Sequence, residues 1–205
     1  MKNILQFILL LLPFLSQSQD LIPYTNPLPK IKPNGTITLL DKSTVIIEGF
    51  KDKETTIFFI VRHAEKDTAG GSNADLNPIG RGRANALVKI FGKVRLDKVL
   101  STDKPRTKHT AQPIANVKHR PVEIYDPKKH QEVLEKLIAE NKGKKILMVG
   151  HSNTVPQIVN ILMIHPNKIG KGGNEEKEFS ESDYSRLYII SVKKIGEATM
   201  QLIRF

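Results

Sequence analysis

Four side chains in this sequence have the chemistry needed to bind and transfer a phosphoryl group. Arg62 and His63 are neighbours, Arg106 follows at a distance, and His151 lies further along still. Arginine presents forked donors that match phosphate oxygens, and a neutral histidine can attack phosphorus. These residues can act together only if the fold brings three separate segments to one place.

The segments before these residues have the patterns of buried strands. Ile57–Val61 is an unbroken run of β-branched and aromatic residues, which is typical of a strand covered on both faces. Lys145–Gly150 leads to His151 in the same way, and Lys98–Ser101 comes shortly before Arg106. Because ligands bind at the carboxyl ends of strands in open α/β sheets, we expect the four side chains to meet at that edge.

Two of these strands are followed by typical helix starts. Pro105 fits the first turn of a helix, which puts Arg106 near a helix N-terminus. Gly150 permits a tight turn, and Ser152 or Asn153 can cap the helix that follows. The free N–H groups of a first helical turn favour an anion, so both positions suit a phosphate.

Strand and helix patterns alternate from residue 55 onward, which predicts an α/β protein with a mostly parallel central sheet and helices on both faces. The expected strands are Ile57–Arg62, Lys98–Ser101, Val122–Tyr125, Lys145–Gly150, Arg186–Val192 and Thr199–Arg204. The expected helices are Pro78–Phe91, Lys104–Ala115, Pro127–Asn141 and Thr154–Met163. Residues 55–205 are therefore expected to form one domain.

The first residues of the chain have the features of a secretory signal. Lys2 supplies the positive charge, Ile4–Leu15 the apolar core, and Ser16-Gln17-Ser18 the small residues of a cleavage site. The apolar run is shorter than the roughly 20 residues of a membrane span. We expect residues 1–18 to be cleaved, and the mature chain to be exported to the periplasm or secreted without a stable membrane anchor. An uncleaved signal that stays as an anchor is the alternative.

Residues 19–54 are expected to form an N-terminal arm. Four prolines in Leu21–Gly35 predict an extended segment without regular structure. Thr36–Leu40 and Thr44–Gly49 are short β-like runs around Asp41-Lys42-Ser43 and predict a hairpin. The sequence suggests no role for this arm beyond packing on the main domain.

Composition narrows the chemistry without choosing the partner. The chain has no cysteine, which excludes disulfides, thiolate catalysis and cysteine-bound metals. Its formal charge of +11 favours anionic partners of any kind. His109, His119 and His165 do not have metal-ligand spacing, and Ile164–Ser182 is either a solvated connection or a loop that closes over the site.

Taken together, the motifs resemble the histidine phosphatase superfamily, which includes the cofactor-dependent phosphoglycerate mutases. The resemblance covers roughly Ile57 to Ile203, and several ordered motifs are more specific than any one of them. The matching stretches are Arg62-His63-Ala64-Glu65, Ser101 through Arg106-Thr107 to Thr110-Ala111, Gly150-His151-Ser152, and Leu76-Asn77-Pro78-Ile79-Gly80 with Arg83-Ala84. The resemblance implies a three-layer α/β/α, phosphoglycerate mutase-like domain.

The resemblance also implies a mechanism. His63 would carry a transient phosphoryl group, which Arg62, Arg106 and His151 would surround, and no metal or other cofactor would be needed. The expected substrate-binding residues are Arg62, Arg106, His151, Ser152, Asn153 and Glu65. The expected partner is a small phosphorylated substrate rather than a specific nucleic acid, and the sequence carries no signal of oligomeric state.

The sequence departs from the family pattern at two places. Ala64 replaces the usual glycine after the nucleophile, which would be strained if that position needed a positive φ. The second place concerns the general acid: in many relatives a Glu lies shortly after the third strand and is followed by a Gly-x-x-Glu-Gly stretch, which this sequence lacks. Asp126 is the first candidate for that acid because it follows a strand end, with His130, Glu132 and Glu65 as alternatives.

These departures resemble the small phosphohistidine-phosphatase-like branch more than the mutases. The motifs of the phytase and acid-phosphatase branch are absent. We therefore expect an exported phosphatase acting on a phosphomonoester or phosphoramidate. The alternatives are a non-catalytic phosphate-binding protein of the same fold, a surface polyanion binder that works through net charge, and a mutase-type phosphotransferase.

Overall fold

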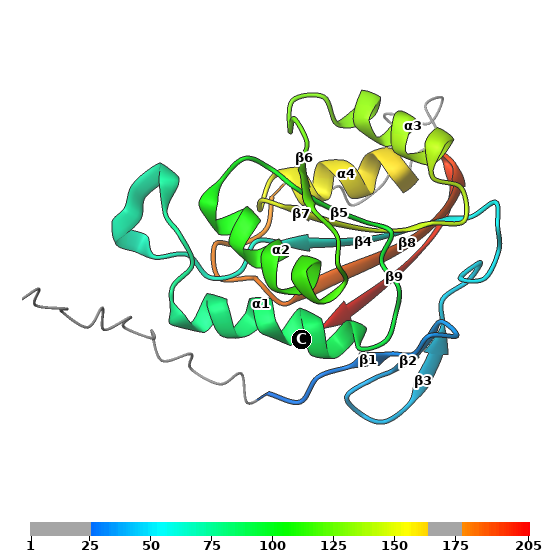
Figure 1. Ribbon diagram of the computed structural model, residues 1–205, viewed down its shortest axis with the longest axis horizontal. Coiled ribbons are helices and arrows are strands. Elements are labelled where there is room, and N and C mark those ends of the chain that lie inside the picture. The colour runs from blue at the N-terminus through cyan, green and yellow to red at the C-terminus, as the bar shows by residue number, and fades with distance from the viewer. Residues whose placement is uncertain (1–25, 164–177) are drawn as a thin grey trace, which may run out of the picture.

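The computed structural model describes residues 26–163 and 178–205 (Figure 1). The expected signal peptide, residues 1–18, lies outside the described residues, and so does most of the stretch Ile164–Ser182. Among the residues described, no helix combines the length and the apolar character needed to cross a membrane.

A six-stranded mixed sheet forms the centre of the molecule. Its strands, in spatial order, are β6 (Val122–Ile124), β5 (Lys98–Ser101), β7 (Lys145–Gly150), β4 (Thr56–Arg62), β8 (Arg186–Lys194) and β9 (Glu197–Arg204). The first four are parallel, whereas β8 runs antiparallel to β4 and β9 antiparallel to β8. The prediction of a mostly parallel sheet is confirmed.

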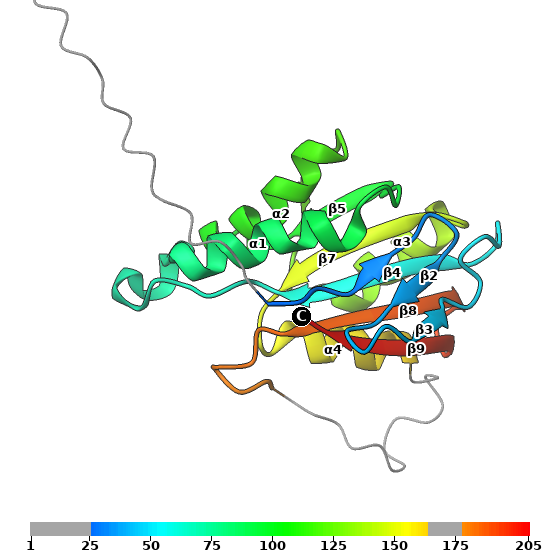
Figure 2. The ribbon, with the colours of Figure 1, turned by 90° about the horizontal axis from the view of Figure 1, so that it is seen from below.

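Helices cover both faces of this sheet (Figures 1 and 2). The helices α1 (Pro78–Phe91) and α2 (Pro105–Val117) pack on one face, and α3 (His130–Glu140) and α4 (Thr154–Met163) pack on the other. Alternate residues of β4 serve the two faces, with Phe59 in the first core and Phe58 in the second. Burying each such side chain contributes about 1.5–3 kcal/mol, which fixes β4 in the middle of three layers.

Element bounds differ from the predictions mainly at turns. The helix expected from Pro127 begins at His130, because the Asp126 side chain accepts a hydrogen bond from Lys128 N (2.9 Å) and holds a turn before it. The last two strands form a tight hairpin, with Gly196 at φ 79°, so β9 begins earlier than expected, at Glu197. A positive φ at that position is the reason a glycine is found there.

The N-terminal arm forms a small antiparallel sheet of its own. It contains β1 (Lys30–Ile31), β2 (Thr36–Thr38) and β3 (Thr44–Ile46), in that order. Strands β2 and β3 form the hairpin expected between Thr36 and Gly49. The stretch predicted to lack regular structure nevertheless contributes β1, because Lys30–Ile31 pairs with β2. The buried side chains of Ile31, Ile37, Ile47 and Phe50 extend the core beside α1.

Candidate active site

The register of two neighbouring strands brings the two histidines together. Arg62 at the end of β4 lies opposite Gly150 at the end of β7, and His63 N donates to Gly150 O at 2.8 Å. The rings of His63 and His151 consequently lie with their centroids 5.4 Å apart. The expectation that the two strand ends share one site follows directly from this parallel pairing.

His63 is held in the form that a nucleophile needs. Its ring is buried, with 3% of the residue exposed, and Nδ1 lies 2.8 Å from the carbonyl oxygen of Ala64. A carbonyl only accepts, so Nδ1 carries the proton and Nε2 keeps its lone pair. Burial lowers the pKa of His63 to about 3, with further lowering by the charges of Arg62 and Arg106. The ring is therefore neutral at neutral pH.

The turn after His63 is built without strain. Among the described residues other than glycine, only Lys42 and His119 have a positive φ, so Ala64 does not need the conformational freedom of glycine. Its amide donates to Thr110 Oγ1 (2.9 Å), and that hydroxyl donates in turn to Arg106 O (2.7 Å). This explains why a threonine stands four residues after Arg106.

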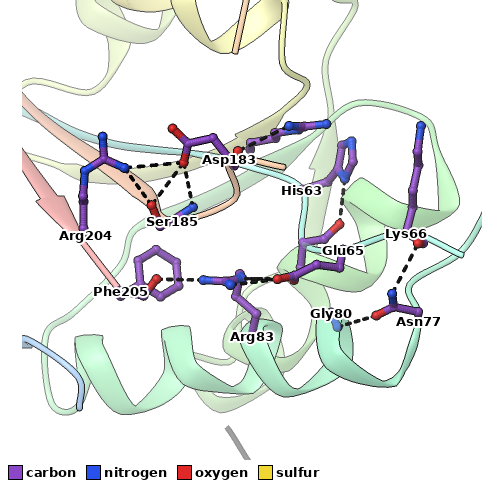
Figure 3. A network of polar contacts seen from close by, with 12 residues as sticks. His63, Glu65, Lys66, Asn77, Gly80, Arg83, Asp183, Ser185, Arg204 and Phe205 are labelled. Atoms are coloured by element: carbon purple, nitrogen blue, oxygen red, sulfur yellow. Dashed lines mark hydrogen bonds and ion pairs between the residues drawn. The ribbon is translucent and has the colours of Figure 1, made fainter. Parts of the chain in front are cut away.

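Gly80 allows α1 to approach the same turn closely. A Cβ atom at this position would lie 2.1 Å from Glu65 O, well inside contact distance. The Asn77 side chain caps the helix by accepting a hydrogen bond from Gly80 N (2.8 Å). The backbone N–H of Asn77 donates to Glu65 O (3.0 Å). The Leu76–Gly80 stretch thus fixes the start of α1 against the loop that follows His63 (Figure 3).

Two arginines each leave one donor unused. The side chain of Arg62 is 2% exposed and donates from Nη1 to Ser180 O (2.8 Å), whereas Arg106 donates from Nη1 to Ser72 O (2.9 Å). The Nε atoms of both arginines are buried and have no hydrogen-bond partner among the described residues. An unpaired buried donor costs about 1–3 kcal/mol, so this pair of N–H groups favours an acceptor such as a phosphoryl oxygen.

His151 is oriented by one donor and one acceptor. Arg106 Nη2 lies 3.5 Å from Nδ1 and can only donate, so Nδ1 is unprotonated. Nε2 then donates to Thr102 Oγ1 at 2.8 Å. Burial, followed by the charges of Arg106 and Arg62, lowers the pKa of His151 to about 4. This ring is also neutral in the free protein and can take up a proton when a dianion arrives.

Glu65, an expected substrate-binding residue, is tied to the scaffold. Arg83 of α1 binds its carboxylate with Nε at 2.9 Å and Nη2 at 2.7 Å, and Arg83 also donates to Phe205 O at 2.7 Å (Figure 3). The side chains of Glu65 and Arg83 are 17% and 14% exposed. Glu65 therefore links the turn after His63 to α1 and the end of the chain.

The other expected acids lie at or after the end of the edge strand β6. Asp126 is exposed and follows β6, three strands from β4, which is about 14 Å at the usual strand spacing. Glu132 is exposed and pairs with Lys129 at 3.9 Å. His130 is buried beside the ring of Tyr125, and burial lowers its pKa. In the described part of the chain, no hydrogen bond or ion pair joins these three residues to His63 or His151.

Among the described residues, neither Ser152 nor Asn153 hydrogen-bonds to Arg62 or Arg106, and Ser152 has other partners. Ser152 Oγ donates to Glu178 Oε1 (2.9 Å), and Ser152 O accepts from Phe179 N (3.1 Å). Asn153 is exposed. The turn before α4 is instead closed by Thr154 Oγ1, which accepts from the amide of His151 at 2.7 Å.

The segment Glu178–Ser185 lies over the site; its first residues belong to Ile164–Ser182, for which the sequence left open a solvated connection or a loop over the site. The ring centroid of Tyr184 is 4.3 Å from Arg62 Cζ and 5.9 Å from the His63 ring centroid. Glu181 pairs with Arg62 (3.4 Å) and Lys66 (3.6 Å). This segment leads into β8, and because β8 is antiparallel, its start lies at the same edge as the end of β4. The antiparallel direction of β8, which the sequence pattern does not reveal, is what brings this segment to the site.

Metal ligands do not gather anywhere in the part of the chain that the structure describes. No group of three or more histidine and carboxylate side chains there could hold a metal ion. The site's charges come instead from guanidinium groups and lysines.

Comparisons with known proteins agree with this geometry. A family model described as histidine phosphatase superfamily (branch 1) matches residues 58–127, which hold His63 and Arg106. No curated protein matched the sequence.

Solved structures share the fold at low sequence identity. The protein histidine phosphatase SixA complexed with tungstate is 18% identical, with a TM-score of 0.56 over 72% of this chain and 96% of that one. A mycobacterial glucosyl-3-phosphoglycerate phosphatase is 13% identical, with a TM-score of 0.56 over 73% and 99%. A phosphoserine phosphatase from Entamoeba histolytica is 17% identical, with a TM-score of 0.52 over 73% and 96%.

The family model and the solved structures cover different parts of the chain. The family model matches the segment that holds His63 and Arg106, and the solved structures share the fold over 72–73% of the chain. Over residues 58–127 the chain is similar to the histidine phosphatase superfamily, branch 1, and it shares its fold with solved phosphatase structures.

Proposed function

We propose that this protein hydrolyses a phosphomonoester or a phosphoramidate through a phosphohistidine on His63. One observation carries the proposal: the Nε donors of Arg62 and Arg106 are buried without a partner among the described residues, and they accompany two neutral histidines, of which His63 is buried. A pocket that only captured anions would need the cations but not an uncharged nucleophile. The SixA and phosphoserine phosphatase structures, which share this fold, support phosphatase chemistry by analogy.

In the first step, Nε2 of His63 attacks phosphorus in line with the leaving group. The P–N bond forms as the bond to the leaving group breaks, and the Nε–H groups of Arg62 and Arg106 bind the equatorial oxygens. His151 takes up a proton as the phosphoryl dianion arrives, which adds a third positive charge. In the second step, water attacks phosphorus and returns His63 to its free form.

The positive charge for this reaction is supplied by side chains. In other phosphoryl-transfer sites a magnesium ion offsets the charge on the transferred group. Here Arg62 and Arg106 have that role, and we propose that hydrolysis proceeds without a metal. Activity in the presence of EDTA tests this point directly.

The experiment that tests the proposal is hydrolysis of p-nitrophenyl phosphate from pH 4 to 8 in EDTA, with wild type beside His63→Ala. We expect turnover by wild type, an acid-labile phosphoryl group on His63 in quenched samples, and no turnover by the variant. If wild type is inert toward a panel of phosphate esters and phosphoramidates while phosphate still raises its melting temperature, the non-catalytic binding function replaces this one.

We also propose that the protein is exported, on the basis of the signal-like residues 1–18. Expression of the full chain in a bacterial host followed by fractionation should find the protein outside the cytoplasm, with its N-terminus near Gln19. Intact residues 1–18 on a cytoplasmic product would contradict export.

A further inference from the structure

A carboxylate belonging to the protein shares a guanidinium with the proposed phosphoryl site. Glu181 Oε2 lies 3.4 Å from Arg62 Nη2 and 3.6 Å from Lys66 Nζ. The backbone around it is anchored to the same arginine, since Arg62 Nη1 donates to the carbonyl oxygens of Ser180 (2.8 Å), Glu181 (3.3 Å) and Asp183 (3.3 Å). The Glu181 side chain itself is 70% exposed. Its carboxylate is therefore held at the site by its backbone but is free to turn.

The geometry of a guanidinium puts this carboxylate next to the reacting group. The Nε–H and Nη2–H bonds of an arginine point in parallel, which is why the fork binds two neighbouring oxygens. In Arg62 the Nη2 position faces Glu181, while Nε has no partner among the described residues. A phosphoryl oxygen bound at Nε would consequently lie beside Glu181 Oε2.

Two anionic oxygens on one fork repel each other unless a proton lies between them. Binding of a phosphorylated substrate at Arg62 thus favours a protonated Glu181 at the open side of the site. His63 is buried and attacks from within the fold, so an in-line leaving group points outward, toward the exposed Glu181. We propose that Glu181 is the general acid that protonates the leaving atom and the general base that later activates water.

Glu181 loses one proton in the first step of the reaction and regains one in the second. As the P–O or P–N bond to the leaving group breaks, its electron pair takes the proton from the Glu181 carboxyl group, and the departing alcohol or amine is neutral. The resulting carboxylate then accepts a proton from the water that attacks the phosphohistidine. Each turnover returns Glu181 to the protonated state with which the reaction began.

Charged groups from three elements face Glu181. Arg62 comes from β4, Lys66 from the loop after it, and Arg106 from α2, and the phenol of Tyr184 lies on Glu181's own segment. The carboxylates named from sequence lack this placement, because Glu65 is bound by Arg83 and Asp126 follows the edge strand β6. The inference rests on the proposed phosphatase function and adds its missing acid.

The test is a leaving-group series measured with wild type and Glu181→Gln. We expect kcat/KM for an alkyl phosphate, which needs a proton, to fall by about 10²–10⁴-fold in the variant, and the rate with 2,4-dinitrophenyl phosphate to change by less than about tenfold. The slope of log rate against leaving-group pKa should steepen, and the alkaline limb of the pH profile should disappear.

Glu54→Gln is the matched control. Glu54 is 65% exposed and pairs with Lys142 at 2.7 Å, so the change removes one carboxylate charge of similar exposure from an ion pair outside the site. It should leave the slope unchanged. Tyr184→Phe tests the neighbouring hydroxyl as a competing acid, while it keeps the ring over Arg62.

Each outcome decides the matter. If Glu181→Gln leaves the slope unchanged, or binds inorganic phosphate more tightly with no leaving-group effect, Glu181 is only an internal anion that competes for Arg62. If Tyr184→Phe and not Glu181→Gln steepens the slope, the acid is the tyrosine. Failure of the phosphatase function itself would be seen separately, as the absence of any wild-type turnover, even with 2,4-dinitrophenyl phosphate.

Discussion

The two sides of the site are built differently. On one side, the turns after β4 and β7 hold His63 and His151 through backbone pairing and short side-chain bonds, with His63 almost completely buried. On the other side, the segment Glu178–Ser185 is attached through carbonyl groups that bind Arg62, and its carboxylate is mostly exposed.

This difference matches the two kinds of chemistry that we propose for the two sides. A nucleophile must stay neutral and aligned, which burial and fixed hydrogen bonds provide. A general acid must exchange protons with solvent and meet leaving groups of different shapes, which an exposed side chain allows. The predictions below test whether this division between a rigid side and an open side is correct.

The largest effect should come from His63. His63→Ala removes the proposed nucleophile, so we expect kcat for p-nitrophenyl phosphate to fall at least about a thousandfold. Binding of inorganic phosphate, measured by calorimetry, should persist because Arg62 and Arg106 remain. His119→Ala, on an exposed histidine, is the control and should keep full activity. A His63→Ala variant with substantial turnover would remove the rigid side from the mechanism.

A smaller loss is expected from Arg106. Arg106→Lys keeps the charge but loses the buried Nε donor and the contact with His151, so kcat should fall by about 10²–10³-fold. Arg95→Lys, on a side chain that is 71% exposed, provides the matched change at the surface. Equal activity of the two variants in a steady-state assay would mean that charge alone suffices at this position.

Gly80 tests whether the rigid side depends on close packing. Gly80→Ala forces a Cβ toward Glu65 O, and such overpacking costs about 1–3 kcal/mol. For a chain of this size we expect the melting temperature to drop by at least about 2–4 °C. Ala139→Ser, on the exposed side of α3, adds a single atom and should leave the melting temperature unchanged. An unchanged melting temperature for Gly80→Ala would show that α1 can move away freely.

The smallest effect concerns stability against pH. The folded pKa values of His63 and His151, about 3 and about 4, lie below the ordinary value of 6.5. Between pH 6.5 and 4 the unfolded chain therefore binds more protons than the folded one, so stability falls as pH falls through this window. Thermal melts should show a shallower fall for His63→Asn than for wild type. Parallel curves would indicate that the buried ring titrates normally.

Much of the fold could be read from the sequence. Unbroken apolar runs such as Ile57–Val61 locate buried strands, and α1 and α4 have the predicted bounds, because local periodicity and helix-start residues determine such elements. The convergence of Arg62, His63, Arg106 and His151 was also predictable, since parallel strands put their carboxyl ends at one edge whatever their order.

The rest depended on contacts between distant segments. Asp126 is the first candidate for the acid from sequence because it follows a strand end, but only the strand order shows that β6 is an edge strand, three strands from β4. Likewise, Glu181 precedes a strand rather than following one, and only the antiparallel insertion of β8 brings it to Arg62. The sequence by itself determined the helices and strands and the sheet edge at which His63 lies, because these follow from local sequence patterns. Strand order and direction are set by the burial of the whole sheet, so the tertiary structure alone decided which carboxylate meets Arg62.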